Sequence, residues 1–213
     1  MEGTMVKFYS KESHELALHA VPGHFATSHS HINYYIDVTS IKTRVKEARA
    51  AAKILAHKAG NLKYVDTIVC MDGTEMIGAF LAEQFEKRNI QSKNQHETYY
   101  VVSPEINYNN QMIFRDNMKN KILGKHIILL LDTTTTGATV RRSLECIRYY
   151  GGMVESVYSI FSTNDSVDGK KVETIFNTDD IPEYEAHEQK DCPLCAKGMK
   201  LEAMVNGFGY SEL

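Results

Sequence analysis

An aspartate, four consecutive threonines and a glycine follow a short apolar run near the middle of the chain. The apolar run is Ile127 to Leu131, and the polar residues after it are Asp132, Thr133, Thr134, Thr135, Thr136, Gly137, Ala138 and Thr139. Residues 140–150 then have helical spacing. The N–H groups and dipole at a helix N-terminus favour a phosphate, and threonine hydroxyls add donors. Because a carboxylate at a strand end suits sugar hydroxyls or a metal, this segment predicts a site for a phosphorylated sugar.

Two other phosphate loops are excluded by the sequence. It contains neither G-x-x-x-x-G-K-[ST] nor a G-x-G-x-x-G that opens a helix. A threonine-rich helix cap without a ligand is the simpler alternative, since threonine is a fair N-cap residue. Four consecutive threonines behind a buried strand exceed what a cap needs, so the anion site is the preferred interpretation.

The same segment resembles the diphosphate-sugar signature of the type I phosphoribosyltransferases. In that signature an apolar strand, two acids and two variable residues precede Thr-Thr-Gly-x-Thr. Asp132 matches the second acid, whereas Leu131 stands where the first acid is expected; the matches to the phosphate cradle are Thr135, Thr136, Gly137 and Thr139. The resemblance implies an enzyme that joins a nucleobase to 5-phosphoribosyl 1-diphosphate, releases pyrophosphate and forms a nucleoside 5′-monophosphate. It also implies Mg²⁺ bound with the diphosphate sugar, and catalysis by positioning and charge stabilisation.

Two further segments are candidates for the pyrophosphate. Asp72, Gly73 and Thr74 follow an apolar segment and precede a helical pattern, and they match the position of the family's pyrophosphate loop. A simple turn between strand and helix is the alternative. Residues 104–124 are long and largely polar, which predicts a lid. Its basic residues are the candidates for meeting the leaving group, and solvated surface is the alternative for each: Arg115, Lys119 and Lys121.

The N-terminal segment resembles the hood of orotate phosphoribosyltransferases. The matching residues are Gly23, Phe25, Tyr34, Tyr35 and Asp37, whereas residues 29–31 (His-Ser-His) replace the family's Ser-Gly-Lys turn. The resemblance implies that Phe25, Tyr34 and Tyr35 bind the base, with an orotate-like pyrimidine favoured and a purine left open. An irregular cover whose tyrosines pack on the core is the alternative interpretation of residues 1–37.

The C-terminal tail contains His187, Cys192 and Cys195 in the spacing His-x4-Cys-x2-Cys. Zinc is bound by such residues, but a structural site needs four ligands. The fourth would be a distant histidine or a residue of a partner chain. A redox pair and ordinary thiols are the alternatives. His24, His29 and His31 form a second histidine cluster, which we interpret as cover rather than as a metal site.

Strand and helix patterns alternate along most of the chain. We expect helices at 40–59, 76–88 and 140–150, and strands at 64–70, 97–103, 127–131, 153–162 and 172–177. This order predicts an α/β fold: an open, twisted, mostly parallel sheet flanked by helices. We expect a single domain, with a core at about 40–165 and a hood formed by residues 1–39 and 166–213. Residues 206–210 are expected to fold back onto the hood.

Bulk properties narrow the functional classes. The chain has 213 residues and a net charge of −3, which argues against nucleic acid as a partner. Neither a membrane-spanning window nor a signal peptide is evident, so we expect a cytoplasmic protein whose partners are small molecules, and a homodimer. A sensor that binds phosphoribosyl diphosphate or a nucleotide without turnover remains the alternative function, because one signature acid is missing.

Overall fold

The central sheet of the computed structural model has six strands. The structure describes residues 4–28, 30–60, 62–108, 111–206 and 209–213. The strand order is β10-β11-β9-β8-β4-β5, and every neighbouring pair is parallel except β10 and β11. The strands are β4 (Thr67–Cys70), β5 (Tyr100–Val102), β8 (His126–Thr134), β9 (Met153–Ser162), β10 (Ser166–Val167) and β11 (Lys170–Asn177). The predicted α/β fold is confirmed, and the central sheet continues to Asn177, past the expected core boundary at 165.

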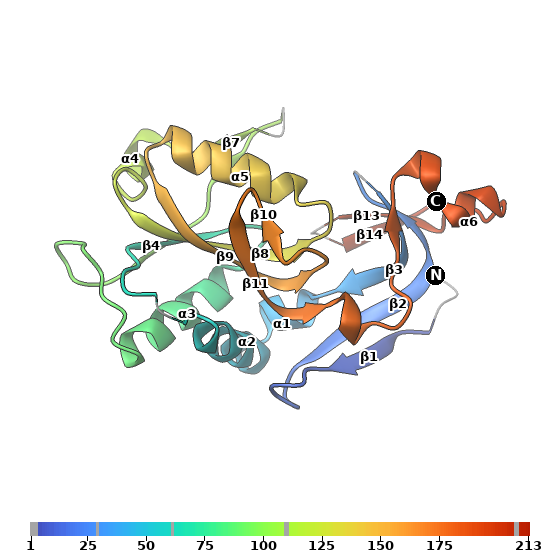
Figure 1. Ribbon diagram of the computed structural model, residues 1–213, viewed down its shortest axis with the longest axis horizontal. Coiled ribbons are helices and arrows are strands. Elements are labelled where there is room, and N and C mark those ends of the chain that lie inside the picture. Colours follow the sequence, from blue (N-terminus) through green and yellow to red (C-terminus); the bar gives the residue numbers. More distant parts are fainter. Residues whose placement is uncertain (1–3, 29, 61, 109–110, 207–208) are drawn as a thin grey trace.

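Helices cover both faces of this sheet (Figure 1). One side carries α1 (Thr39–Thr43), α2 (Val45–His57) and α3 (Glu75–Lys87), and the other carries α4 (Asp116–Lys119) and α5 (Ala138–Tyr149). Side chains of β8 alternate between the two cores, so Ile128 and Leu130 pack with α2 and α3, whereas Leu129 and Leu131 pack with α5. Leu131 is therefore fully buried beneath α5.

Two predicted elements have a different form in the structure. The helix expected at 40–59 is two helices, because Arg44 between them has an extended backbone (φ −98°, ψ 122°). The long polar stretch 104–124 contains a small hairpin, β6 (Glu105–Ile106) and β7 (Met112–Ile113), followed by α4. Asn109 and Asn110 lie outside the described residues.

The hood is a second, six-stranded sheet made from both ends of the chain. Its order is β12-β3-β2-β13-β14, with β1 paired to β2. The strands are β1 (Val6–Tyr9), β2 (Ala17–Ala26), β3 (His31–Asp37), β12 (Ala186–His187), β13 (Ala203–Asn206) and β14 (Gly209–Glu212). The described residues among 1–37 are therefore mainly strands rather than an irregular cover, although Tyr34 packs on the core as that alternative expected. Figure 1 shows the red C-terminal segments beside the blue N-terminal strands, as expected for residues 206–210, of which 207 and 208 lie outside the described residues.

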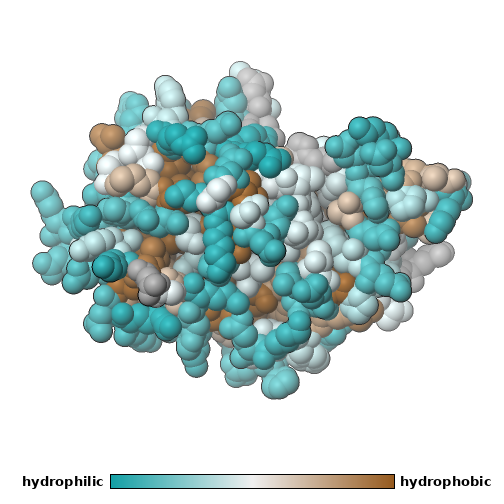
Figure 2. All heavy atoms as spheres, viewed as in Figure 1, coloured by the Kyte–Doolittle hydropathy of each residue, from teal (hydrophilic) through white to brown (hydrophobic). Residues whose placement is uncertain are grey.

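Short helical turns lie before and after β12: η1 (Thr178–Asp180) follows β11 of the central sheet, whereas η2 (Gln189–Asp191) and α6 (Pro193–Ala196) lie between β12 and β13. The hood has a small apolar core of its own, centred on Phe25. The face of the molecule seen in Figure 2 is covered mainly by hydrophilic side chains, with hydrophobic residues visible between them. In the described part of the chain, no helix is both long enough and apolar enough to cross a membrane.

Candidate active site

A cavity of about 400 Å³ lies where the C-terminal end of β8 meets the hood. The predicted sugar-phosphate segment forms one wall, from Asp132 to Thr139. The remaining lining residues come from the hood, the Asp72 loop and β9: Thr27, Ser28, Ile32, Tyr35, Ile36, Asp72, Phe161, Tyr184, Val205 and Asn206. The fold therefore brings together the central segment, one residue of the predicted pyrophosphate loop and one of the predicted base-binding residues.

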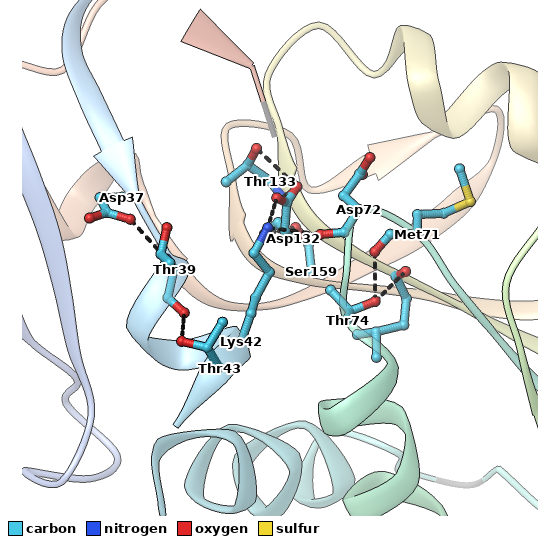
Figure 3. Close-up of polar contacts among 11 residues, drawn as sticks. Asp37, Thr39, Lys42, Thr43, Met71, Asp72, Thr74, Asp132, Thr133 and Ser159 are labelled. Carbon is cyan, nitrogen blue, oxygen red and sulfur yellow. Dashed lines mark hydrogen bonds and ion pairs between the residues drawn. The ribbon is translucent and has the colours of Figure 1, made fainter. Parts of the chain in front are cut away.

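Asp132 is buried at the floor of this cavity and forms an ion pair (Figure 3). Its Oδ2 lies 2.8 Å from Lys42 Nζ, and its Oδ1 accepts a hydrogen bond from the Thr133 N–H. Lys42 also donates to the Asp72 carbonyl oxygen at 2.7 Å. Lys42 is on α1, and its two partners lie 30 and 90 residues away along the chain, so no local pattern in the sequence indicates this contact.

Asp72 and Asp132 line the same cavity and form an acid pair. Burial, assisted by the nearby Asp132 carboxylate, raises the pKa of the Asp72 carboxyl to about 7. Burial also raises the pKa of Asp132, against the opposing effect of Lys42. Asp72 has a left-handed backbone (φ 55°), a conformation that aspartate tolerates better than most residues. The negative charge of Asp132 therefore disfavours ionisation of Asp72, and Lys42 partly offsets this effect.

The loop before α5 is fixed from outside the cavity. The Thr135 carbonyl accepts hydrogen bonds from Thr163 Oγ1, at 2.6 Å, and from Asn164 Nδ2. The Thr136 carbonyl accepts one from Arg141 Nη2 at 2.9 Å. Gly137 caps α5 in the left-handed region (φ 71°) that favours glycine. The loop is thereby held as a rigid turn at a helix N-terminus, which is the arrangement that binds phosphate.

The Asp72 loop is fixed by Thr74, which does not reach the cavity. Thr74 is fully buried, and its hydroxyl donates to the carbonyls of Met71 (2.8 Å) and Leu130 (3.3 Å). Its N–H also donates to the Met71 carbonyl. The predicted role of Thr74 in binding pyrophosphate is therefore wrong for its side chain, which instead ties the loop to β8. Gly73 is exposed next to Asp72.

Of the three predicted base-binding residues, Tyr35 alone lines the cavity, although its ring contacts that of Phe25 in the hood core, with centroids 6.2 Å apart. Tyr35 lines the cavity, and burial together with Asp37 raises its pKa to about 12. Phe25 is fully buried in the hood core. Tyr34 packs against the core beneath α2, because neighbouring residues of a strand face opposite sides. The expectation that Phe25 and Tyr34 contact the base is thus corrected.

Two aromatic residues that the sequence analysis missed line the same cavity. Phe161 and Tyr184 have ring centroids 5.3 Å apart in an edge-to-face arrangement. The buried Tyr184 hydroxyl has no hydrogen-bond partner among the described residues. Tyr184 follows a turn after the predicted last strand, where a single tyrosine carries little signal.

The three basic residues predicted to belong to a lid form hydrogen bonds or ion pairs with neighbouring residues on the surface. Arg115 forms two hydrogen bonds with the Glu105 carboxylate, at 2.6 and 2.7 Å, and Lys119 lies 2.6 Å from Asp116. Lys121 donates to the Asn117 carbonyl. In place of these three residues, Arg142 lies beside Asp72, in an adjoining cavity of about 480 Å³ that also includes Thr139.

The predicted metal ligands are also rearranged. His187 lies 3.2 Å from Glu185 and is outside the cluster that contains the two cysteines. Cys192 and Cys195 instead meet His24 and His31, and the four ligand atoms lie within 4.8 Å of one another. His29 is outside the described residues.

Known proteins resemble this chain in sequence. The chain is 31% identical to orotate phosphoribosyltransferase of Pyrococcus horikoshii over 156 residues, covering 70% of this chain and 74% of that protein. It is 26% identical to the Pyrococcus abyssi orotate phosphoribosyltransferase over 144 residues, covering 65% of this chain and 71% of that protein. No family model matches the chain.

Solved structures show the same fold. A phosphoribosyltransferase from Corynebacterium diphtheriae has a TM-score of 0.52 at 19% identity, covering 76% of this chain and 90% of that one. Orotate phosphoribosyltransferase of Mycobacterium tuberculosis, in complex with Fe(III) dicitrate, has a TM-score of 0.52 at 12% identity, covering 76% and 91%. The chain therefore belongs to the type I phosphoribosyltransferases, a family of pentosyltransferase enzymes, and its relatives are orotate phosphoribosyltransferases.

Proposed function

We propose that this protein transfers the phosphoribosyl group of 5-phosphoribosyl 1-diphosphate to an orotate-like pyrimidine and releases pyrophosphate. The observation that carries this proposal is the single cavity in which Asp132 and the rigid threonine loop face Tyr35 and Tyr184 of the hood segments. One end of the cavity is built for a sugar phosphate, and the other is lined by aromatic rings. The orotate phosphoribosyltransferases among the relatives support the choice of base.

Each wall of the cavity has a role in this reaction. The loop from Thr133 to Thr139 and the N-terminus of α5 would bind the 5′-phosphate. Asp132 would accept hydrogen bonds from the ribose hydroxyls. The Asp72 loop, Lys42 and Arg142 would contact the diphosphate, because Asp72 lines both cavities, Arg142 lines one of them and Lys42 donates to the Asp72 carbonyl.

The acid pair fits Mg²⁺. Asp72 and Asp132 are carboxylates with raised pKa values at one cavity, and hard cations prefer such oxygen ligands. When bound with the substrate, Mg²⁺ would neutralise part of the diphosphate charge. The protein residues would hold the ribose hydroxyls and the loop in fixed positions.

The chemical step needs no covalent intermediate. The base nitrogen forms a bond to C1′ and gives up its proton to water, as the bond between C1′ and the diphosphate oxygen breaks and the diphosphate leaves with that electron pair. C1′ is positively charged in the transition state, so catalysis comes from alignment and from charge stabilisation of the leaving group. Lys42, held between Asp132 and the Asp72 loop, would supply positive charge beside that group.

Pyrophosphate release with a panel of bases tests the proposal. The assay contains the diphosphate sugar, Mg²⁺ and one of orotate, uracil, adenine, hypoxanthine or guanine, with mass spectrometry of the product. We expect release with orotate and formation of orotidine 5′-monophosphate. Release only with a purine would overturn the choice of base. Tight nucleotide binding without release in any mixture would instead identify a sensor.

The homodimer and the cytoplasmic location expected from the sequence remain predictions. Size-exclusion chromatography with light scattering would measure the mass of the assembly in solution, and cell fractionation would test the location.

A further inference from the structure

We propose that four side chains bind a structural Zn²⁺ ion that fastens the C-terminal segment to the hood. The four side chains are His24, His31, Cys192 and Cys195. They come from three separate parts of the chain: β2, β3 and the short segment around α6. In Figure 1 α6 lies beside the N-terminal strands of the hood.

The distances between the ligand atoms fit a tetrahedral zinc site. With Zn–N near 2.0 Å and Zn–S near 2.3 Å, tetrahedral geometry puts two nitrogens about 3.3 Å apart and nitrogen and sulfur about 3.5 Å apart. His24 Nε2 lies 3.2 Å from His31 Nδ1. The same His24 nitrogen lies 3.5 Å from Cys192 Sγ and 3.7 Å from Cys195 Sγ. Cys195 Sγ lies 3.2 Å from His31 Nδ1.

A neighbouring carbonyl prepares His24 for metal binding. Its Nδ1 lies 3.0 Å from the Met199 carbonyl oxygen, which can only accept a hydrogen bond. The ring proton is therefore on Nδ1, and Nε2 presents a lone pair to the other three ligand atoms. Histidine ligands in metal sites are oriented by such a hydrogen bond on the second nitrogen.

The type of ligand indicates which metal binds, and the number of ligands indicates whether its role is structural or catalytic. Two thiolates and two imidazoles are typical of zinc, and four protein ligands leave no position for a substrate. Three of the four residues are buried: His24 (0% exposed), His31 (6%) and Cys192 (4%). The site is therefore structural, and it is separate from the residues assigned to phosphoribosyl transfer.

The segment that contains the cysteines has little else to hold it in place. Most residues from 188 to 200 are exposed, and α6 is only four residues long. The chain then enters β13, which pairs with β2 through Ala203 and Met204. Val205, in the same strand, lines the active-site cavity. The metal would thus fix the part of the chain that completes the cavity wall.

Metal analysis of the purified protein tests this proposal directly. The protein is produced in zinc-supplemented medium, without a histidine tag, and zinc is measured by mass spectrometry. We expect about one zinc per chain, as in other four-ligand sites. His31→Asn and Cys195→Ser should each lose most of it. His187→Asn is the matched control, because His187 pairs with His31 across β3 and β12, and Cys146→Ser is the control for cysteine; both should retain the metal.

Thiol reactivity gives a second measurement that does not depend on the variants folding. Cys195 is exposed, so a metal-free protein should react rapidly with a thiol reagent at this residue. A zinc thiolate should be protected until a chelator is added, after which hydrogen exchange in residues 186–206 should increase. A folded parent protein without zinc and with a reactive Cys195 would overturn the proposal. So would a Cys192–Cys195 disulfide in the freshly purified protein, or equal zinc loss in His187→Asn.

Discussion

Lys42 Nζ lies 2.8 Å from Asp132 Oδ2, and the two side chains are only 10% and 3% exposed. The same ammonium group donates to the Asp72 carbonyl at 2.7 Å. One cation on α1 therefore connects the strand end that is proposed to hold the ribose with the loop that is proposed to hold the diphosphate. Since α1 directly follows β3, the position of this charge depends on the junction between hood and core.

Lys42→Met should strongly destabilise the protein. The substitution keeps an unbranched side chain but leaves Asp132 as a buried carboxylate without its partner, which typically costs about 3–5 kcal/mol. Urea unfolding at pH 7 measures the free energy of unfolding. Lys46→Met is the control: Lys46 forms an exposed pair with Glu15, and such pairs contribute about 1 kcal/mol or less.

A double variant separates the charge from the packing. In Lys42→Met/Asp132→Asn the lone carboxylate is gone, so much of the lost stability should return, although turnover should not. A double variant no more stable than Lys42→Met alone would show that Lys42 acts through its packing and would contradict the ion-pair explanation.

Asp72 should make substrate binding depend on pH near neutrality. Its pKa is raised from 3.8 to about 7 in the folded protein, so the carboxyl loses its proton as the pH rises through that value. Mg²⁺ binds the ionised form. The Mg²⁺-dependent affinity for the diphosphate sugar should therefore increase from pH 6 to pH 8, as measured by calorimetry, and Asp72→Asn should flatten this profile.

The same pKa predicts the opposite trend for stability without ligand. The folded protein binds the Asp72 proton more tightly than the unfolded chain, so this group stabilises the fold below pH 4, and its contribution is lost as the pH rises through about 7. Urea unfolding of the parent and of Asp72→Asn at pH 5 and pH 8 would show it. A parent whose loss of stability between these pH values is no larger than that of the variant would contradict the raised pKa.

The sequence contained most of the information about the central segment. An apolar run, an acid and a threonine loop before a helix are local features, and the structure has β8, the rigid loop and α5 in these places. The sequence also predicts correctly that Leu131 lies within the strand, but it does not show which face of the sheet the side chain is on. Leu131 faces α5 because strand side chains alternate, and its neighbour Asp132 faces the cavity. An acid at 131 would thus enter the core beneath α5 rather than the site.

Features made by distant residues could not be read from the sequence. Nothing near Lys42 indicates that it pairs with Asp132, and nothing near Cys192 indicates His24 and His31. His187 was expected as the metal ligand because it is close to the cysteines along the chain, whereas the pairing of β2 with β3 brings the other two histidines together. Thr74 was predicted to bind pyrophosphate. Nothing in the sequence around a threonine after Asp-Gly indicates that its hydroxyl instead donates to a backbone carbonyl of the protein.

Gly137→Ala should destabilise the loop and weaken binding of the sugar phosphate. An added Cβ would lie 2.9 Å from Val167 Cγ2, at a backbone φ of 71° that side chains disfavour. Backbone strain of this kind costs about 1–3 kcal/mol, and the steric contact adds to it. Thermal shift with and without ribose 5-phosphate measures both stability and binding.

Gly169→Ala is a matched control for the glycine prediction. Gly169 has nearly the same φ (72°), but an added Cβ there meets nothing within 4 Å. The difference in stability between the two variants therefore measures the effect of the contact with Val167. The double variant Gly137→Ala/Val167→Ala should regain the stability that this contact removes. If Gly137→Ala costs no more than Gly169→Ala and still binds ribose 5-phosphate, the loop is not the rigid phosphate site described here.

Arg142 and Arg115 are the two candidates for the cation that contacts the diphosphate. Arg142 lines the cavity beside Asp72 and lowers the pKa of that carboxyl slightly, against the larger effect of burial. Arg115 is exposed and paired with Glu105 in the structure. If the reaction uses the geometry seen here, Arg142→Gln should weaken the diphosphate sugar about ten- to a hundredfold, the usual effect of losing one charge-assisted hydrogen bond. Steady-state kinetics with each variant gives KM and kcat separately.

The kinetic pattern decides between a preformed site and a closing lid. Arg142→Gln should raise KM for the diphosphate sugar, because Arg142 already borders the cavity before the substrate binds. Arg115→Gln should leave both constants nearly unchanged. A fall in kcat for Arg115→Gln, with KM unaffected, would show that the segment 104–124 closes over the site after binding and brings Arg115 to the leaving group in the transition state. In that case the Arg115–Glu105 pair is broken during each turnover, and Glu105→Gln should increase the rate of closure.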